Sequence, residues 1–314
     1  MNVTMTYLIT IILPQFLLIL FGSGLRKMKS FTESFWSGLE TMVFYVLFPP
    51  LLFNSVYKSQ FNLEASAWFL LVAVSCMLGA VCLSWLVNQF YQESAWTKWS
   101  VFHCGFRFNT YIGFAICQPL LGNEGFALLS LLIAIWVPIS NTIAVVTLSF
   151  ATNSESKFNF FNRLKTVVKN PLIIATLTGL FFNLLKIPLL PLIDIFIGYL
   201  SSAALALGLL CIGAGLKFDD VKKYKTLIAW CTLERLILVP FLAICLSILL
   251  LPNPVEACVL ILFAALPTAQ SCYVMTSKMK GDGAAVADLT SSQTLLSMLT
   301  LTGWVLLMKN YFLG

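Results

Sequence analysis

Long apolar runs recur along the whole chain and are separated by short polar connections. An α-helix needs about 20 apolar residues to cross the hydrocarbon core of a bilayer, whereas a membrane β-barrel shows short alternating segments. The pattern predicts ten spans, at about residues 5–25, 32–56, 64–90, 96–120, 124–149, 167–185, 189–214, 223–250, 255–279 and 283–308. We therefore expect an all-α polytopic membrane protein with ten transmembrane helices.

The second half of the chain repeats the first at an offset of 158 residues. At this offset Asn109-Thr110 falls on Pro267-Thr268, and the turn at 123–125 falls on the turn at 281–283. Each repeat holds five predicted spans. Because five is odd, the second copy enters the membrane upside down, which is a recurrent design of secondary transporters.

The repeat predicts a single transmembrane transporter domain over residues 1–314. Repeat one covers about 1–150 and repeat two about 167–314, and a short cytoplasmic connection at 151–166 joins them. No polar tract is long enough to fold as a separate soluble domain.

Two predicted spans carry helix breakers near their middle. In span four, Asn109 and Thr110 can cap a new helix that begins at mid-membrane. In span nine, Pro267 removes a backbone donor, and Thr268 and Gln270 can serve the freed groups. The N-terminus of a half-helix has free N–H groups and a positive dipole end, which suit an anion. We predict that broken helices 4 and 9 cross at a substrate site. For Pro267 alone, a kink without a ligand is the simpler interpretation.

Composition agrees with a membrane protein. Hydrophobic residues make up 59% of the chain and charged residues 10%, against about 25% charged in soluble domains. The mean hydropathy is +0.91. The net charge of +6 is spread over the connections, so we expect no nucleic-acid partner. Basic residues follow the first apolar run and none precedes it, which argues against a cleavable signal peptide.

Lysine and arginine are unevenly shared between the two sides of the predicted membrane protein. The odd-numbered connections hold 14 of the 19, namely Arg26, Lys27, Lys29, Lys98, Lys157, Arg163, Lys165, Lys169, Lys217, Lys222, Lys223, Lys225, Lys278 and Lys280. The other side holds Lys58, Lys186 and Lys309. Because cytoplasmic loops are enriched in positive charge, we predict a multi-pass protein of the plasma membrane (a bacterial inner membrane) with both termini outside.

Several ionisable groups lie inside predicted spans. Arg107 sits near mid-span, where an arginine costs about 2.5–3.5 kcal/mol on insertion scales, so it needs the substrate anion or Glu234 as a partner. His103 lies one turn earlier and could relay protons or be a packed, hydrogen-bonded residue. Glu234, Arg235 and Asp288 are candidates for ion pairing or for coupling to an ion.

Other candidate chemistry is sparse. Asn141 in span five must find hydrogen bonds, either in a cavity or between helices. All nine cysteines lie in apolar runs, none forms a Cys-x-x-Cys pair, and the chain has one histidine. We therefore expect no metal site and no cofactor. No nucleophile–base pair stands out, so we predict that the protein is not an enzyme.

Three stretches resemble the auxin efflux carrier family of transporters, in its bacterial form. They are GFRFNTYIGFAICQPLLGNEGFALLSLLIAIWVPISN at 105–141, KNPLIIATLTGLFFNLLKIPL at 169–189 and FAALPTAQSCYVMTSKMKGDG at 263–283. The similarity runs over essentially the whole chain. It implies two inverted five-helix repeats, as in the bile, arsenite and riboflavin transporter superfamily, with helices 4 and 9 crossing at the substrate site. It also implies an organic anion as substrate: auxin in plants, malonate or malate in some bacteria.

By position, the resemblance assigns Asn109, Thr110, Pro267 and Thr268 to the crossing. Two departures matter. The connection at 150–166 is short, unlike the long hydrophilic loop of many plant members. The stretch LPTAQ from Leu266 has no acid, whereas sodium-dependent relatives use one there, which argues against sodium coupling.

We therefore predict a permease that carries a small organic anion, such as malate, malonate or an auxin-like acid, by alternating access. The predicted substrate-binding residues are Arg107, Asn109, Thr110, Asn141, Pro267, Thr268 and Gln270. A sodium-dependent symporter of the bile acid transporter type and a membrane sensor that no longer transports are the alternatives. The coupling ion, the direction of transport and a homodimeric state stay open.

Overall fold

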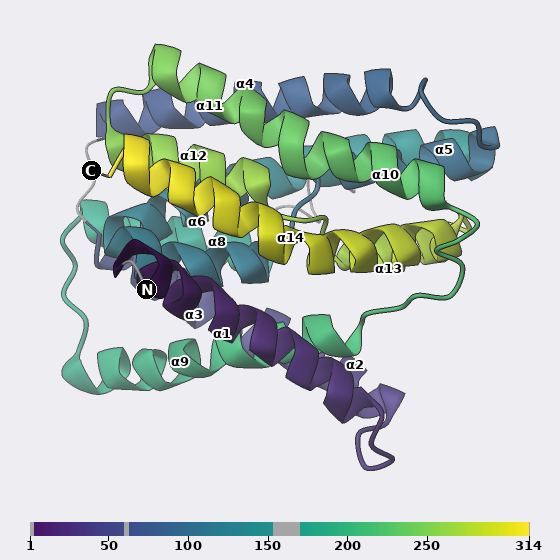
Figure 1. Ribbon diagram of the computed structural model, residues 1–314. Helices are drawn as coiled ribbons and strands as arrows, with labels where there is room; N and C mark the ends of the chain where they lie inside the picture. Colours follow the sequence, from purple (N-terminus) through teal and green to yellow (C-terminus); the bar gives the residue numbers. More distant parts are fainter. Residues whose placement is uncertain (1–2, 60–62, 153–169, 314) are drawn as a thin grey trace.

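The computed structural model describes residues 3–59, 63–152 and 170–313, and these form helices without any strand among them (Figure 1). The first half contains α1 (Val3–Arg26), α2 (Glu33–Met42), η1 (Val43–Leu47), α3 (Phe48–Tyr57), α4 (Leu63–Val87), α5 (Ala95–Phe102), η2 (His103–Gly105) and α6 (Thr110–Thr152). The second half contains α8 (Pro171–Leu184), α9 (Pro191–Ala214), α10 (Lys225–Leu233), η3 (Glu234–Leu238), α11 (Val239–Leu250), α12 (Pro254–Ala265), α13 (Ser271–Lys278) and α14 (Gly283–Tyr311).

Within the described residues, the helices begin and end close to the predicted spans. Five helical segments are long and apolar enough to cross a membrane: Glu33–Tyr57, Ser66–Val87, Ala95–Ala151, Pro191–Ala214 and Lys225–Leu250. Three shorter apolar helices, Thr10–Arg26, Pro171–Leu184 and Pro254–Ala265, accompany them. The chain is therefore a multi-pass membrane protein. The predicted connection at 151–166 and the start of span six lie almost entirely outside the described residues.

The predicted interruptions of the fourth and ninth spans are confirmed. In the fourth, α5 and η2 end at Gly105 and α6 begins only at Thr110. In the ninth, α12 ends at Ala265 and α13 begins at Ser271. Neither gap is helical, so the backbone groups of both must find partners elsewhere in the protein.

A single glycine separates the fourth span from the fifth. Gly122 has a φ of +64° and breaks α6 into two helical parts, before and after the turn. A residue with a side chain rarely adopts this conformation, which is why glycine stands here. The predicted division between residues 120 and 124 is thus confirmed.

Two π-helical turns interrupt spans two and eight, which the sequence pattern did not predict. In η1 the N–H of Phe48 reaches the carbonyl of Val43, and in η3 that of Val239 reaches Glu234. Both turns lie just before prolines, at residues 49–50 and at 240. Because proline has no N–H, a local wider turn lets the remaining donors and carbonyls find partners.

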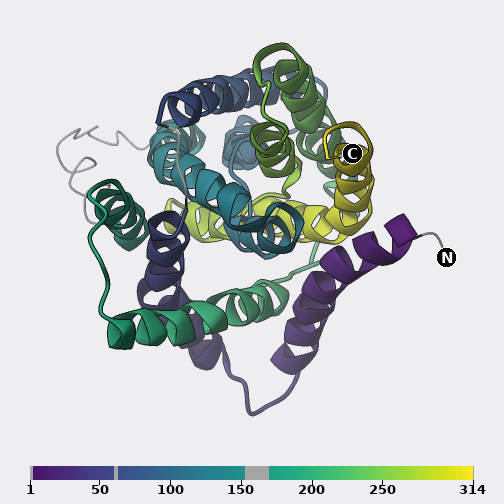
Figure 2. The same cartoon turned by 90° about the vertical axis from the view of Figure 1, so that its left-hand side faces the viewer.

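The helices pack in two groups. One group holds α1, α2, α3, α8 and α9, and the other holds α4 to α6 and α10 to α14 (Figures 1 and 2). The groups meet mainly where α1, α3 and α9 contact α6, and where α1 contacts α14. Both broken helices lie in the second group, and their interrupted segments are largely buried.

Candidate functional site

The two helix breaks hold each other together. The backbone N–H of Asn109 donates to the carbonyl of Pro267 over 2.8 Å. In return, the hydroxyl of Thr268 lies 2.6 Å from the carbonyl oxygen of Cys104, at the end of the first half of helix 4. Each break thus supplies a partner for a backbone group that the other has freed, which lets both exist away from water.

Two long side chains donate to further carbonyls near the breaks. Trp136 donates its indole N–H to the carbonyl of Phe106 over 2.9 Å. Arg235, which is fully buried, donates from Nη2 to the carbonyl of Phe263 over 3.3 Å. The ring centroids of Phe108 and Phe263 lie 3.7 Å apart, so an aromatic side chain of the first break packs directly on one from the last turn of α12.

Gln293 of α14 holds the ninth-span break by hydrogen bonds to Thr268 and to the carbonyl of Cys231. Its Oε1 accepts from the backbone N–H of Thr268 over 3.2 Å and lies 2.6 Å from the Thr268 hydroxyl. Its Nε2 donates to the carbonyl of Cys231 over 3.0 Å. The hydroxyl has one hydrogen for two acceptors, Cys104 O and Gln293 Oε1, so it can serve only one of them at a time.

Asn109 also starts the second half of helix 4. Its Oδ1 accepts from the backbone N–H of Ile112 over 3.3 Å, and its own carbonyl accepts from Gly113 over 3.1 Å. This is the N-cap arrangement that the sequence predicts for Asn109-Thr110. The first turn of α6 therefore begins where the two breaks meet, and its positive dipole end lies there.

Arg107 lies in the first break and has no carboxylate partner within 4.0 Å among the described residues. Its Nη2 donates to the hydroxyl of Ser271 over 3.1 Å and its Nη1 to the sulfur of Met275 over 3.5 Å. Among the described residues, the ion pairs within 4.0 Å join Arg26 to Glu33 and Lys58 to Asp194. The alternative in which Arg107 pairs with Glu234 is therefore not realised, and a 9%-exposed cation lies beside the first residue of α13.

Glu234 instead bonds to a hydroxyl. Its Oε1 accepts from Ser84 of α4 over 2.5 Å. Gly105 lies so close that an added Cβ would overlap both Glu234 Oε1 and Ser84 Oγ. The neighbouring Arg235 forms no ion pair within 4.0 Å among the described residues, and its Nε and Nη1 are buried without a hydrogen-bond partner there. Neither residue belongs to the ion pair that the sequence offered as one interpretation.

Asp288 is a structural acceptor. Its two carboxylate oxygens accept from the backbone N–H groups of Asp219 and Asp220, each over 2.8 Å. It thereby fixes the connection before α10 to the start of α14, and no cation lies within 4.0 Å of it among the described residues. Of the two roles considered for Asp288, ion pairing or coupling to an ion, no ion pair forms among the described residues, because neighbouring backbone donors satisfy its charge.

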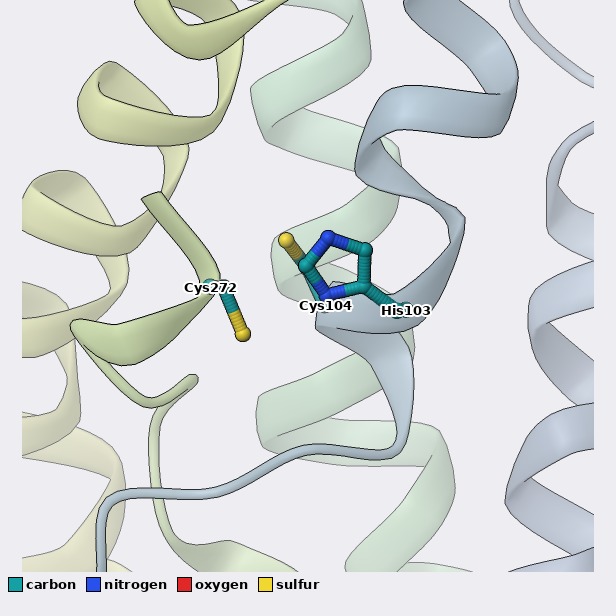
Figure 3. Close-up of side chains that lie close together, drawn as sticks. All are labelled: His103, Cys104 and Cys272. Atoms are coloured by element: carbon teal, nitrogen blue, oxygen red, sulfur yellow. The ribbon is translucent and has the colours of Figure 1, made fainter. Parts of the chain in front are cut away.

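His103 lies beside two cysteines (Figure 3). Its Nε2 is 3.0 Å from the hydroxyl of Thr276, while its Nδ1 is buried without a hydrogen-bond partner in the described part of the chain. The nearest ligand-type atoms of His103, Cys104 and Cys272 all lie within 4.8 Å of one another. The sequence does not predict this cluster, because 168 residues separate Cys104 from Cys272.

Two of the amide side chains that the sequence predicts at the site have buried atoms without a partner in the described part of the chain. The Oδ1 of Asn141 and the Nε2 of Gln270 are buried without a hydrogen-bond partner among the described residues. Gln270 lies beside Gly215, at the end of α9, where its Cδ would be 4.0 Å from an added Cβ. Because buried polar atoms cost free energy unless they are bonded, both amides are open to a polar partner.

A polar cavity of about 160 Å³ lies between α3 and α6. Its lining includes Asn54, Ser55, Lys58, Gln118 and Asn123. Lys58 is paired with Asp194 over 2.7 Å. The cavity lies where the two groups of helices meet, near the Gly122 turn and thus at the far end of the α6 segment that begins at Thr110.

The membrane transport protein family matches the chain in two segments, residues 7–160 and 157–305. The chain belongs to this family. It is the family of the auxin efflux carriers, so the resemblance predicted from the three motifs is confirmed.

Two relatives of this membrane transport protein match along nearly their full length. An "Uncharacterized transporter" of Methanothermobacter thermautotrophicus is 24% identical over 299 residues, which cover 93% of this chain and 96% of the relative. A "Putative malonate transporter" of Rhizobium meliloti is 23% identical over 309 residues, or 96% of this chain and 95% of the relative. Both names describe transporters, which agrees with the family.

Several residues that contact the breaks are not among those predicted from the sequence. They are Ser84, Cys104, Trp136, Ser271, Cys272, Thr276 and Gln293. Trp136 and Gln293 had a usable signal, because a tryptophan N–H or a glutamine amide inside an apolar span needs a partner. The two cysteines had no such signal, since buried cysteine is common as a small apolar residue.

Proposed function

We propose that the protein is a secondary transporter of a small organic anion, a mono- or dicarboxylate, that binds at the crossing of the broken helices. Arg107 carries the proposal: it is a nearly buried cation beside the N-terminus of α13, without a carboxylate partner among the described residues. A cation in the membrane interior marks a substrate or ion pathway by default. A carboxylate of the substrate would supply the missing charge partner.

The other predicted residues would complete the site. Asn109 and Thr110 present the positive end of α6, and Pro267 and Thr268 hold the opposite break in place. Gln270 and Asn141 have buried amide atoms free to bond substrate. In this proposal Arg107 binds a carboxylate of the substrate. The amides of Gln270 and Asn141 bind its other polar groups and so determine which anions fit.

The name of the relative from Rhizobium meliloti favours a carboxylate substrate. At 23% identity this name motivates the choice of test compounds and does not identify the substrate of this chain. A malonate-sized dianion would suit Arg107 together with the half-helix N-terminus of α6, because each favours negative charge.

We propose ten spans in two inverted repeats as the machinery of transport, within one domain. Helix positions support this at the offset of 158 residues. Leu63 at the start of α4 falls on position 221, four residues before α10, and position 123 after the Gly122 turn falls on 281, two residues before α14. Rocking of the two helix groups against each other would then expose the crossing to either side in turn.

The test is uptake of radiolabelled malonate, malate and indole-acetate into proteoliposomes. Asn109→Asp is the informative variant. It keeps the oxygen that caps Ile112 but adds a negative charge where the anion would bind, so we expect uptake to fall by at least about tenfold. Asn253→Asp is the matched control, because Asn253 caps Val255 at the start of α12 in the same way, away from the crossing.

Arg107→Gln should raise the KM by about 10- to 100-fold, since a charge-assisted hydrogen bond contributes about 1.5–3 kcal/mol. Uptake that stays unchanged in both crossing variants would refute the site while leaving transport intact.

Imposed proton and sodium gradients, applied separately, would identify the coupling ion. An absolute sodium requirement would favour the symporter alternative.

A further inference from the structure

We infer that His103, Cys104 and Cys272 form a binding site for one thiophilic divalent metal ion of the Zn²⁺ class. His103 and Cys104 lie in η2 at the end of the first half of helix 4, and Cys272 lies at the start of α13 (Figure 3). An ion bound there would join the two broken helices through metal–ligand bonds. The inference concerns binding and does not depend on transport.

The geometry needs little change to reach metal-bonding distances. The three ligand atoms already lie within 4.8 Å of one another. With Zn–S bonds near 2.3 Å and tetrahedral angles, two sulfur ligands are about 3.8 Å apart. A closure of about 1 Å, within reach of rotation about the cysteine Cα–Cβ bonds, would therefore complete the set.

The hydrogen bonds of His103 leave one ring nitrogen, Nδ1, free. Nε2 is 3.0 Å from the Thr276 hydroxyl, and Nδ1 is buried without a partner in the described part of the chain. A metal-bound histidine usually donates its second ring N–H to a fixed acceptor, which orients the ring and sets the tautomer. With Nε2–H donating to Thr276, the lone pair on Nδ1 is available to an ion.

The donor set selects the class of ion. Two thiolates and a neutral imidazole are soft or borderline ligands, and they favour Zn²⁺ or Cd²⁺ over Mg²⁺ and Ca²⁺. The side chains are fully or almost fully buried, with exposed fractions of 0%, 1% and 0%. One divalent ion and two thiolates sum to zero charge, which a buried site tolerates far better than an unbalanced charge.

Binding has a defined proton balance. Two S–H bonds break, two metal–sulfur bonds form with one metal–nitrogen bond, and two protons leave for the solvent. No electron is transferred. Where both thiols are protonated in the free protein, the apparent affinity should therefore rise about 100-fold per pH unit.

The experiment is equilibrium dialysis of the purified, reduced full-length protein in detergent against ⁶⁵Zn²⁺, with excess Mg²⁺ present. We expect one ion per chain for wild type and a loss of most of this binding in Cys104→Ala/Cys272→Ala. Cys76→Ala/Cys117→Ala is the matched control, because it also removes two buried cysteines from other helices and should bind one ion. Cd²⁺ should compete with the bound zinc.

A single conservative change guards against misfolding of the double variant. His103→Gln keeps a polar side chain of similar reach, and it should weaken binding by at least about tenfold, since removing one ligand removes one metal bond. Absence of binding by wild type would overturn the inference. So would full binding by the Cys104/Cys272 variant, or equal loss in the control variant.

Discussion

Thr268 is the residue on which both helix breaks depend. Its hydroxyl lies within hydrogen-bond distance of Cys104 O and Gln293 Oε1, and its backbone N–H is bonded to the same glutamine. Thr268→Val keeps the shape of the side chain but removes the hydroxyl, so the buried carbonyl of Cys104 loses this donor while Gln293 Oε1 keeps its bond from the Thr268 backbone N–H. We expect a loss of about 1–3 kcal/mol in the free energy of unfolding.

Thermal unfolding in detergent would measure this effect. Thr268→Ser keeps the hydroxyl and should recover most of the lost stability. Thr302→Val is a suitable control, since the Thr302 hydroxyl donates to the carbonyl of Met298 within its own helix. A Thr268→Val protein as stable as wild type would show that Gln293 and the Asn109–Pro267 bond suffice to hold the breaks.

At the scale of single residues, local chemistry was predictable and long-range proximity was not. The breaks at Asn109 and Pro267 can be predicted from the sequence. Helix capping and the missing N–H of proline both act within one turn of the chain. The meeting of His103 with Cys272 follows from how helices pack, which one sequence does not reveal. The partners of Asp288 were unpredictable for the same reason, since they are backbone groups from another connection.

At the scale of helices, the contact between α1 and α9 depends on glycine. A Cβ added at Gly213 would overlap the carbonyl oxygen of Ile19, and one added at Gly22 would overlap that of Leu210. Small residues let membrane helices approach closely and gain packing contacts. Gly213→Ala should therefore force the helices apart and destabilise the protein by about 1–3 kcal/mol.

The control for this prediction lies in the same helix. An added Cβ at Gly198 meets no atom within 4 Å, so Gly198→Ala should be neutral or slightly stabilising through helix propensity. Melting temperatures of the two variants in one detergent provide the comparison. Equal melting temperatures would mean that the α1–α9 contact adjusts freely.

Helix boundaries were predictable to within a few residues because apolar runs, caps and prolines mark them. The Gly122 turn was predictable in the same way. The π-helical turns η1 and η3 were not, since a proline in a membrane helix can also produce a simple kink. Whether a π-helical turn or a kink forms depends on the side chains packed around the freed carbonyls. One of them is Trp304, which donates to the carbonyl of Leu236 in η3.

At the scale of the whole molecule, the connections before α2, α5 and α10 and after α13 lie toward one end (Figure 1). Hydrogen bonds join three of them: Trp96 donates to the carbonyl of Lys280, and Tyr224 and Thr97 donate to Asp282. These connections are rich in lysine and arginine. Because cytoplasmic loops are enriched in positive charge, we propose that this end faces the cytoplasm.

Reporter fusions would test the orientation of the full chain. With both termini outside, alkaline phosphatase fused after Gly314 should be active and green fluorescent protein at the same place should be dark. Green fluorescent protein inserted into the 151–166 connection should fluoresce and serves as the control. The opposite pattern would invert the proposed topology.

The reciprocal bonding of the two breaks has a consequence for how the protein is made. Asn109 leaves the ribosome 158 residues ahead of Pro267, its hydrogen-bond partner. At about 5–20 residues per second, the first break must wait roughly 8–30 s in or beside the bilayer before the second arrives. During biogenesis the fourth span therefore has to stay sheltered, by the insertion machinery or by closing into an unbroken helix, until the ninth span is delivered.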